Sequence, residues 1–168
     1  MSETLQQLAF YTDAAMIVFA ALMVVTLRNI FHCALFLALG FFGIAGIFVM
    51  LHAEFLAGVQ VMIYVGAIAV LVLFAIMLTR GVTGQDMKQT NKQSPVAGAI
   101  ALLFVVFLLK LMAGARFATS TVAPVKDSTA FLGQLLVTRY VLPFEVASIV
   151  LLMAMVGALL LAKEKEDE

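Results

Sequence analysis

The sequence predicts an all-α integral membrane protein with five transmembrane helices, and three observations support this prediction. Of the 168 residues, 64% are hydrophobic and 12% are charged, whereas a soluble domain carries about a quarter charged residues. The apolar residues gather in runs close to the roughly 20 residues that an α-helix needs to cross the hydrocarbon core of a bilayer. None of these runs alternates with the period of two that marks an outer-membrane barrel strand. Helices are the other way to satisfy the hydrogen-bonding groups of the backbone in lipid.

The apolar runs and the connections between them define the expected architecture. We expect helices near residues 8–27, 31–51, 55–79, 96–115 and 141–162. The first two connections are tight turns, so the first three helices should be antiparallel neighbours. Residues 116–140 contain Pro124 and several Ser, Thr and charged residues, which are typical of a longer surface loop, here on the outer side. We therefore expect one membrane domain over residues 1–168, ending in a charged cytoplasmic tail at 163–168.

Basic residues are unevenly distributed between the two ends of these helices. The richer side is expected in the cytoplasm, which places the N-terminus outside and the C-terminus inside. Lys110 lies within a helix and can reach the poorer side with its long side chain. The richer side carries Arg28, Arg80, Lys88, Lys92, Lys163 and Lys165, and the poorer side carries Arg116, Lys126 and Arg139. Residues 1–7 contain no Lys or Arg, so we expect the first helix to be retained rather than cleaved as a signal peptide.

Small residues indicate where the helices pack closely. Gly40, Gly43 and Gly46 recur at every third position of the second helix and form a slanted ridge. In the last helix, Ala147, Ala154 and Ala158 fall on one face, with Gly157 beside them. Membrane helices associate through such faces because the backbones can approach each other. We expect some of these faces to contact helices of other subunits.

Three acids lie within or beside the predicted helices, where ionisable groups are costly. Asp13 is near the outer end of the first helix, and we expect an interfacial, structural role. Glu54 opens the third helix, where a carboxylate complements the helix dipole. Glu145 follows Pro143 at the start of the last helix. There it is either another first-turn acid or a partner for a cation or for water on a neighbouring helix.

Two uncharged polar residues lie on one face of the third helix. Gln60 and Tyr64 are four residues apart, and Ala67 continues the same stripe. A glutamine in an apolar helix requires hydrogen-bond partners, and Tyr64 is closer to mid-membrane than the interfacial belt where tyrosines gather. The pair either contacts water or only bonds to neighbouring helices.

The sequence gives little support for metal or haem binding, a disulfide, nucleic-acid binding or catalysis by this chain. His32 and His52 lie at opposite ends of the second helix, about 30 Å apart at 1.5 Å per residue, so they cannot bind one metal or haem together. The single cysteine, Cys33, cannot form an internal disulfide and is expected to be a packing residue. The net charge is zero, which gives no reason to expect nucleic-acid binding. We identify no nucleotide-binding loop and no catalytic residues.

Three segments carry a resemblance to a known family. Residues 28–35, Arg-Asn-Ile-Phe-His-Cys-Ala-Leu, resemble the turn between the first two helices of the J-type (subunit 6) membrane subunit of respiratory complex I, a proton-pumping NADH–quinone oxidoreductase. Ile30 stands where that family commonly has proline. Residues 53–78 resemble its third helix, above all in the Tyr-Val-Gly-Ala-Ile core at 64–68. Residues 142–148, Leu-Pro-Phe-Glu-Val-Ala-Ser, resemble the start of its last helix.

The resemblance implies a function for the third helix. In this family that helix carries a π-bulge, which is thought to form and relax as the helix opens a hydrated path towards proton-transferring acids of the K-type subunit. The hinge residues would be Tyr64, Val65, Gly66 and Ala67. Residues on or near the proton path or in contact with water would be Gln60, Glu54 and Glu145, and those packing on other subunits would be Val70 and Met77. Gln60 stands where some relatives have glutamate.

The same resemblance implies partners and cofactors. The K-, A-, H- and N-type membrane subunits would be neighbours, and the flavin (FMN), iron–sulfur clusters and quinone would be bound by partner subunits and not by this chain. A bacterial inner (plasma) membrane is the expected location, with an organellar or thylakoid membrane as the alternative. Two alternatives remain: a passive scaffold subunit of another respiratory or photosynthetic membrane complex, and a small self-contained transporter. The third-helix motif argues against the first, and the scarcity of mid-membrane acids argues against the second.

Overall fold

A computed structural model describes residues 3–79, 94–115 and 128–163 of the chain, and every regular element in these ranges is a helix. Five of the described helices are long and apolar enough to cross a membrane, which confirms the predicted all-α membrane class. The chain divides into two compact units, Met1–Ala123 and Pro124–Glu168, and each is considered by itself. The predicted polar connection at 80–93, most of the predicted loop before residue 128 and the tail after Lys163 lie outside the described residues.

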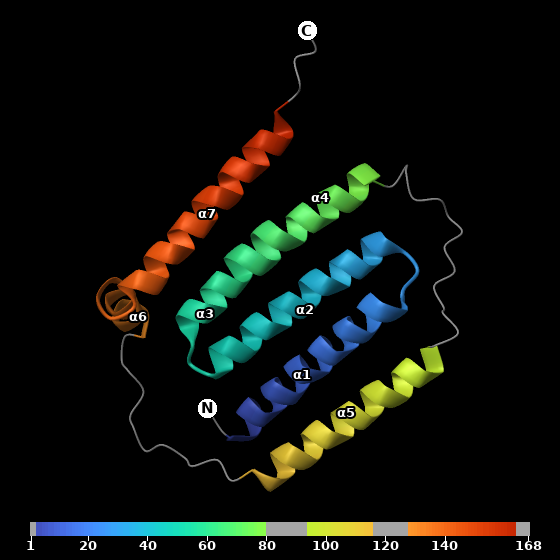
Figure 1. Cartoon of the computed structure of the whole chain (residues 1–168). Coiled ribbons are helices and arrows are strands. Elements are labelled where there is room, and N and C mark those ends of the chain that lie inside the picture. The colour runs from blue at the N-terminus through green and yellow to red at the C-terminus, as the bar shows by residue number, and fades with distance from the viewer. Residues whose placement is uncertain (1–2, 80–93, 116–127, 164–168) are drawn as a thin grey trace. The chain divides into compact units, whose positions relative to one another are not determined.

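The first unit begins with two antiparallel helices, α1 (Glu3–Thr26) and α2 (Ile30–Met50), which pack along each other (Figure 1). Asn29 caps α2: its side-chain oxygen accepts a hydrogen bond from the N–H of Phe31 at 3.0 Å. This bond satisfies one of the N–H groups that a helix start leaves without an intrahelical partner. The thiol of Cys33 donates to the carbonyl oxygen of Leu27 at 3.3 Å, so the expected packing cysteine also helps to close the turn.

The turn from α2 into the next helix is closed by two backbone hydrogen bonds. The N–H of His52 donates to the carbonyl of Val49, and the N–H of Ala53 donates to the carbonyl of Phe48, which is the Schellman pattern of a helix end. His52 has φ of 58°, in the left-handed region where glycine is the usual residue. This tight turn sends the chain back along α2.

The third span is one continuous helix in three parts: α3 (Glu54–Val59), the π-helical segment η1 (Gln60–Ile68) and α4 (Ala69–Thr79). All three parts contact α2, so α2 lies between α1 and the third span (Figure 1). The predicted antiparallel arrangement of the first three helices is therefore present in the structure. The fourth span is α5 (Ser94–Gly114).

The second unit consists of α6 (Ser128–Thr138) and α7 (Val141–Ala162), which contact each other. The expectation of a surface loop up to residue 140 is wrong for α6. Its residues from Ala130 to Val137 are largely apolar and form a helix too short to cross the membrane. The polar residues before it dominated the sequence pattern and concealed the apolar segment that follows them.

Buried side chains in the described residues are few and small. The buried apolar residues are Ala20, Ala34, Ala45, Ala57 and Ala69. Large apolar side chains are mostly exposed on this chain alone, for example Met62 at 76% and Leu161 at 90%. Close approach of helix backbones therefore holds α1, α2 and the third span together. Lipid tails and the helices of other membrane proteins are the surroundings that suit such an exterior.

Candidate functional site

The π-helical segment η1 interrupts an otherwise regular membrane-spanning helix. The N–H of Ala69 donates to the carbonyl of Tyr64, five residues earlier, where an α-helix would use the carbonyl four residues earlier. Such segments are rare and frequently mark functional sites. The nine residues of η1 run from Gln60 to Ile68, so they include all four residues, Tyr64 to Ala67, for which the resemblance implied a bulge.

Gln60, the first residue of η1, is held against α2. Its side chain is only 7% exposed, and its Nε2 donates to the backbone carbonyl of Phe41 at 3.4 Å. This is a long hydrogen bond by the usual range of about 2.7–3.2 Å, yet it gives a polar group within the membrane a partner. The structure thus provides the inter-helix bond that was one of the two interpretations of Gln60.

Tyr64 contacts the same residue of α2. Its ring meets the Phe41 ring edge-on, with centroids 5.4 Å apart and planes at 73°, a geometry that aromatic pairs favour. Phe41 therefore contacts η1 twice, through its carbonyl with Gln60 and through its ring with Tyr64. The first half of η1 is tethered at one point of α2.

Gly66 lies in the second half of η1 and is exposed on this chain. A Cβ atom built there would lie 3.4 Å from the carbonyl oxygen of Val61, which is an ordinary contact for one methyl group. Ala67 is exposed on this chain and Val65 is half-buried. A methyl group is therefore tolerated at position 66, whereas a larger, β-branched side chain restricts the backbone.

Three further site residues were expected from the sequence. Glu54 is exposed in the first turn of α3, where its carboxylate complements the helix dipole. Glu145 is exposed and is the fifth residue of α7, beyond its first turn, so the first-turn interpretation is wrong. It belongs to the second unit. Met77 is 58% exposed in α4.

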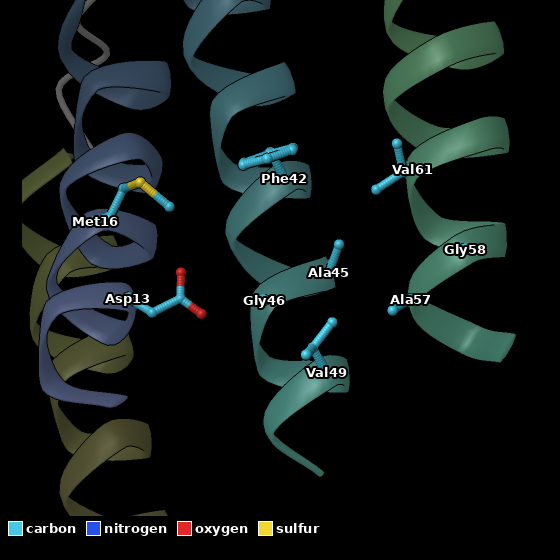
Figure 2. A pocket seen from close by; sticks show the side chains of 9 residues that line it. All are labelled: Asp13, Met16, Phe42, Ala45, Gly46, Val49, Ala57, Gly58 and Val61. Carbon is cyan, nitrogen blue, oxygen red and sulfur yellow. The ribbon is translucent and has the colours of Figure 1, made fainter. Parts of the chain in front are cut away.

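The glycine ridge of α2 faces α1. A Cβ on Gly40 would lie 3.6 Å from Cβ of Ala20, one on Gly43 would lie 2.6 Å from Cγ1 of Ile17, and one on Gly46 would lie 2.6 Å from Oδ2 of Asp13. The last two distances are shorter than a real Cβ contact, so a side chain at either position would force Ile17 or Asp13 to move. Figure 2 shows the Asp13 carboxyl pointing from α1 towards Gly46, beside a hollow of about 350 Å³ whose opposite wall is α3.

Two features were missed from the sequence. Phe41 is one of many apolar residues in α2 and carries no signal of its role, because its contacts come from residues about twenty positions away. The pairing of Asp13 with Gly46 had a partial signal, an acid in one helix and a glycine ridge in the next, but the sequence does not give their register. In the described residues, no three His, Cys, Asp or Glu side chains come together in a way that could hold a metal ion.

Comparison with known proteins gives a consistent family. Residues 20–161 match the family of NADH-ubiquinone/plastoquinone oxidoreductase chain 6. The chain is 39% identical to NAD(P)H-quinone oxidoreductase chain 6 of Leptolyngbya boryana, with 100% of this chain and 87% of that protein covered. It is 37% identical to F(420)H(2) dehydrogenase subunit J of Methanosarcina mazei, covering 95% of this chain and 92% of the relative. NADH-quinone oxidoreductase subunit J of Rhodobacter capsulatus is 40% identical, over 91% of this chain and 79% of its own length.

Proposed function

Since the chain belongs to the NADH-ubiquinone/plastoquinone oxidoreductase chain 6 family, we propose that it is a membrane-arm subunit of a proton-translocating NADH–quinone oxidoreductase, and that η1 is its gate. The observation that carries the gating role is the π-helical segment at Gln60–Ile68 in the middle of a membrane span. The segment coincides with the motif of the third helix that resembles the family.

A π-helical segment can act as a gate because it holds one more residue per turn than the helix on either side. Conversion of η1 to α-helix rotates the helix beyond it by about 100°, the angle of one residue. Gln60 and Tyr64 hold the first half of η1 on Phe41. The rotation is therefore delivered to α4, where it turns exposed residues such as Val70 and Met77 towards different neighbours.

In this proposal the residues of this chain position neighbouring groups and gate the proton path, and electron transfer takes place in partner subunits. Gln60 has an amide, which can orient water or a neighbouring group but cannot carry a proton at neutral pH. Glu54 and Glu145 can bind protons, and we place them beside the proton path. Flavin, iron–sulfur clusters and quinone belong to partner subunits in this proposal.

The exposed apolar surface supports a position among other membrane subunits. The described residues of α5 and α7 are almost all exposed on this chain, and helices with such apolar surfaces need lipid or other helices around them. We place the K-, A-, H- and N-type subunits of the membrane arm there, in a bacterial inner membrane. The predicted orientation, with the N-terminus outside, belongs to the same proposal.

The substitution Gly66→Val tests the gate. A β-branched residue that raises the cost of interconversion by about 1.4 kcal/mol slows it about tenfold. We expect NADH-driven quinone reduction and proton translocation in membrane vesicles to fall together by about that factor, with the complex assembled normally on a native gel. Gly66→Ala is the matched control, because its methyl group fits at 3.4 Å from Val61. Full coupled activity in assembled Gly66→Val enzyme contradicts the gating role.

A further inference from the structure

The corner between α6 and α7 combines a basic and an aromatic side chain, and the gate proposed above does not involve it. Arg139 and Tyr140 are the two residues between these helices, and both are exposed on this chain. Their N–H groups both donate to the carbonyl of Leu135, at 3.0 and 2.9 Å, and the carbonyl of Tyr140 accepts from the N–H of Phe144 at 3.0 Å. The backbone of the corner is therefore fixed by hydrogen bonds to both helices.

The length of α7 places this corner at the edge of the hydrocarbon core. α7 has 22 residues, from Val141 to Ala162, and at 1.5 Å per residue it is about 33 Å long, close to the roughly 30 Å of the core. When α7 crosses the bilayer, the two residues directly before Val141 therefore lie at the level of the lipid headgroups. Arginine and tyrosine suit this level, because each has an apolar part and a polar end.

The helix before the corner runs across the start of α7 and does not continue its direction. Figure 1 shows α6 end-on at the beginning of α7, which is seen from the side. With 11 residues, α6 is too short to cross the membrane. Its leucines at 132, 135 and 136 are half-buried, whereas Phe131 and Val137 are 47% and 62% exposed. A short helix at headgroup level with exposed apolar side chains lies in the membrane interface, with those side chains against the acyl chains.

The guanidinium of Arg139 lies over the ring of Tyr140, with its Cζ atom 5.9 Å from the ring centroid. A contact of this kind holds the cation through its flat face. It does not use the N–H groups, which point outwards in the plane of the guanidinium. These N–H groups form the fork that fits two oxygens of a phosphate. Tyr140 thus holds a phosphate-binding group at the corner.

We propose that the corner of α6 and α7 binds an anionic phospholipid, with the guanidinium fork of Arg139 on the headgroup phosphate and the exposed apolar side chains of α6 against the acyl chains. Such a lipid offers both chemistries at the depth of the corner: a negative charge at headgroup level and hydrocarbon directly beneath it. An acidic protein segment offers only the charge. The lipid site is independent of the gating role of η1.

Tryptophan fluorescence of the full chain in lipid nanodiscs tests the proposal. The chain contains no tryptophan, so Val137→Trp, two residues before Arg139, provides a single reporter. Phospholipids brominated on their acyl chains quench tryptophan on contact, and brominated phosphatidylglycerol is compared with brominated phosphatidylcholine at equal content. We expect phosphatidylglycerol to be enriched beside the reporter by up to about fivefold, the factor that one basic side chain gives near an anionic lipid surface. Equal quenching by the two lipids, or quenching by neither, overturns the proposal.

Substitutions in the reporter chain assign the preference to Arg139. Arg139→Gln should abolish it, and Lys110→Gln, which removes a basic side chain from α5, is the matched control and should leave it unchanged. An equal loss in both variants would show a general attraction of anionic lipid to the chain and contradict a site at the corner. Arg139→Lys decides the matter if Arg139→Gln does not insert into the nanodisc. It keeps the charge without the planar fork, so it should weaken the preference, and a preference at full strength contradicts the contact with phosphate.

Discussion

The two faces of α2 hold their neighbouring helices in different ways. On the α1 face, Gly43 and Gly46 lie so close to α1 side chains that an added Cβ would come within 2.6 Å of them. On the other face, Phe41 meets η1 through a hydrogen bond of 3.4 Å and a ring contact with centroids 5.4 Å apart. We call the α1–α2 interface the first seam and the α2–η1 interface the second seam. The first depends on the absence of side-chain atoms at Gly43 and Gly46, and the second depends on two directional contacts.

This difference indicates which part of the first unit can move. In the α1–α2 seam, backbone and side chains are in direct contact, so any shift either opens a void or creates an overlap. In the α2–η1 seam, the hydrogen bond of the Gln60 side-chain amide and the ring contact can break without any atoms overlapping. We expect α1 and α2 to behave as one rigid pair, and η1 to be the part that changes its contacts.

The largest effect is expected from breaking the rigid seam. In Gly43→Ala the new methyl group overlaps Cγ1 of Ile17, at 2.6 Å, and such overpacking costs about 1–3 kcal/mol. Gly40→Ala makes the same chemical change with 3.6 Å to Ala20, and alanine favours the helix by up to about 1 kcal/mol. We expect the yield and thermal stability of the assembled complex to fall only in Gly43→Ala. Equal behaviour of the two variants would show that the seam is not tightly packed.

A smaller effect is expected from breaking the amide contact of the second seam. Gln60→Leu removes the bond to the carbonyl of Phe41, and a typical hydrogen bond contributes about 0.5–1.5 kcal/mol. We expect faster hydrogen–deuterium exchange of backbone amides in η1, with exchange in α1 and the first half of α2 unchanged. Met62→Leu, at a side chain that is 76% exposed on this chain, serves as the control. Faster exchange in both seams would show that they are not independent.

The ring contact sharpens the comparison further. Phe41→Leu removes the aromatic edge and leaves the backbone carbonyl for Gln60, and aromatic pairs contribute about 0.5–1.5 kcal/mol beyond the area they bury. A double-mutant cycle of Phe41→Leu with Tyr64→Leu, measured as thermal stability of the complex, should give a coupling energy of that size. Tyr64→Phe keeps the ring and should show no loss. A coupling energy of zero would show that the ring of Tyr64 does not help to hold η1 on Phe41.

The sequence predicted the parts of this molecule that depend on local pattern. The five membrane spans follow from runs of apolar residues, and the location of η1 came from the resemblance around Tyr64–Ala67, because composition alone does not distinguish a π-helical turn. The contacts of Phe41 and the fit of Asp13 on Gly46 depend on the register between helices, which no local pattern contains. The short helix α6 was missed because a polar segment precedes its apolar residues.

The smallest effect is expected at the turn that joins the two seams. His52 adopts φ of 58°, where a left-handed conformation costs a residue with a Cβ about 1–2 kcal/mol and costs glycine little. Because glycine also gains entropy in the unfolded chain, His52→Gly should raise the stability of the complex by less than about 1 kcal/mol. A small rise in melting temperature would detect this gain. His52→Ala, which keeps the Cβ, should give no rise. A loss of stability in His52→Gly would mean that the imidazole contributes more than its backbone strain costs, and that the turn is held by its side chain as well as by the bonds to Phe48 and Val49.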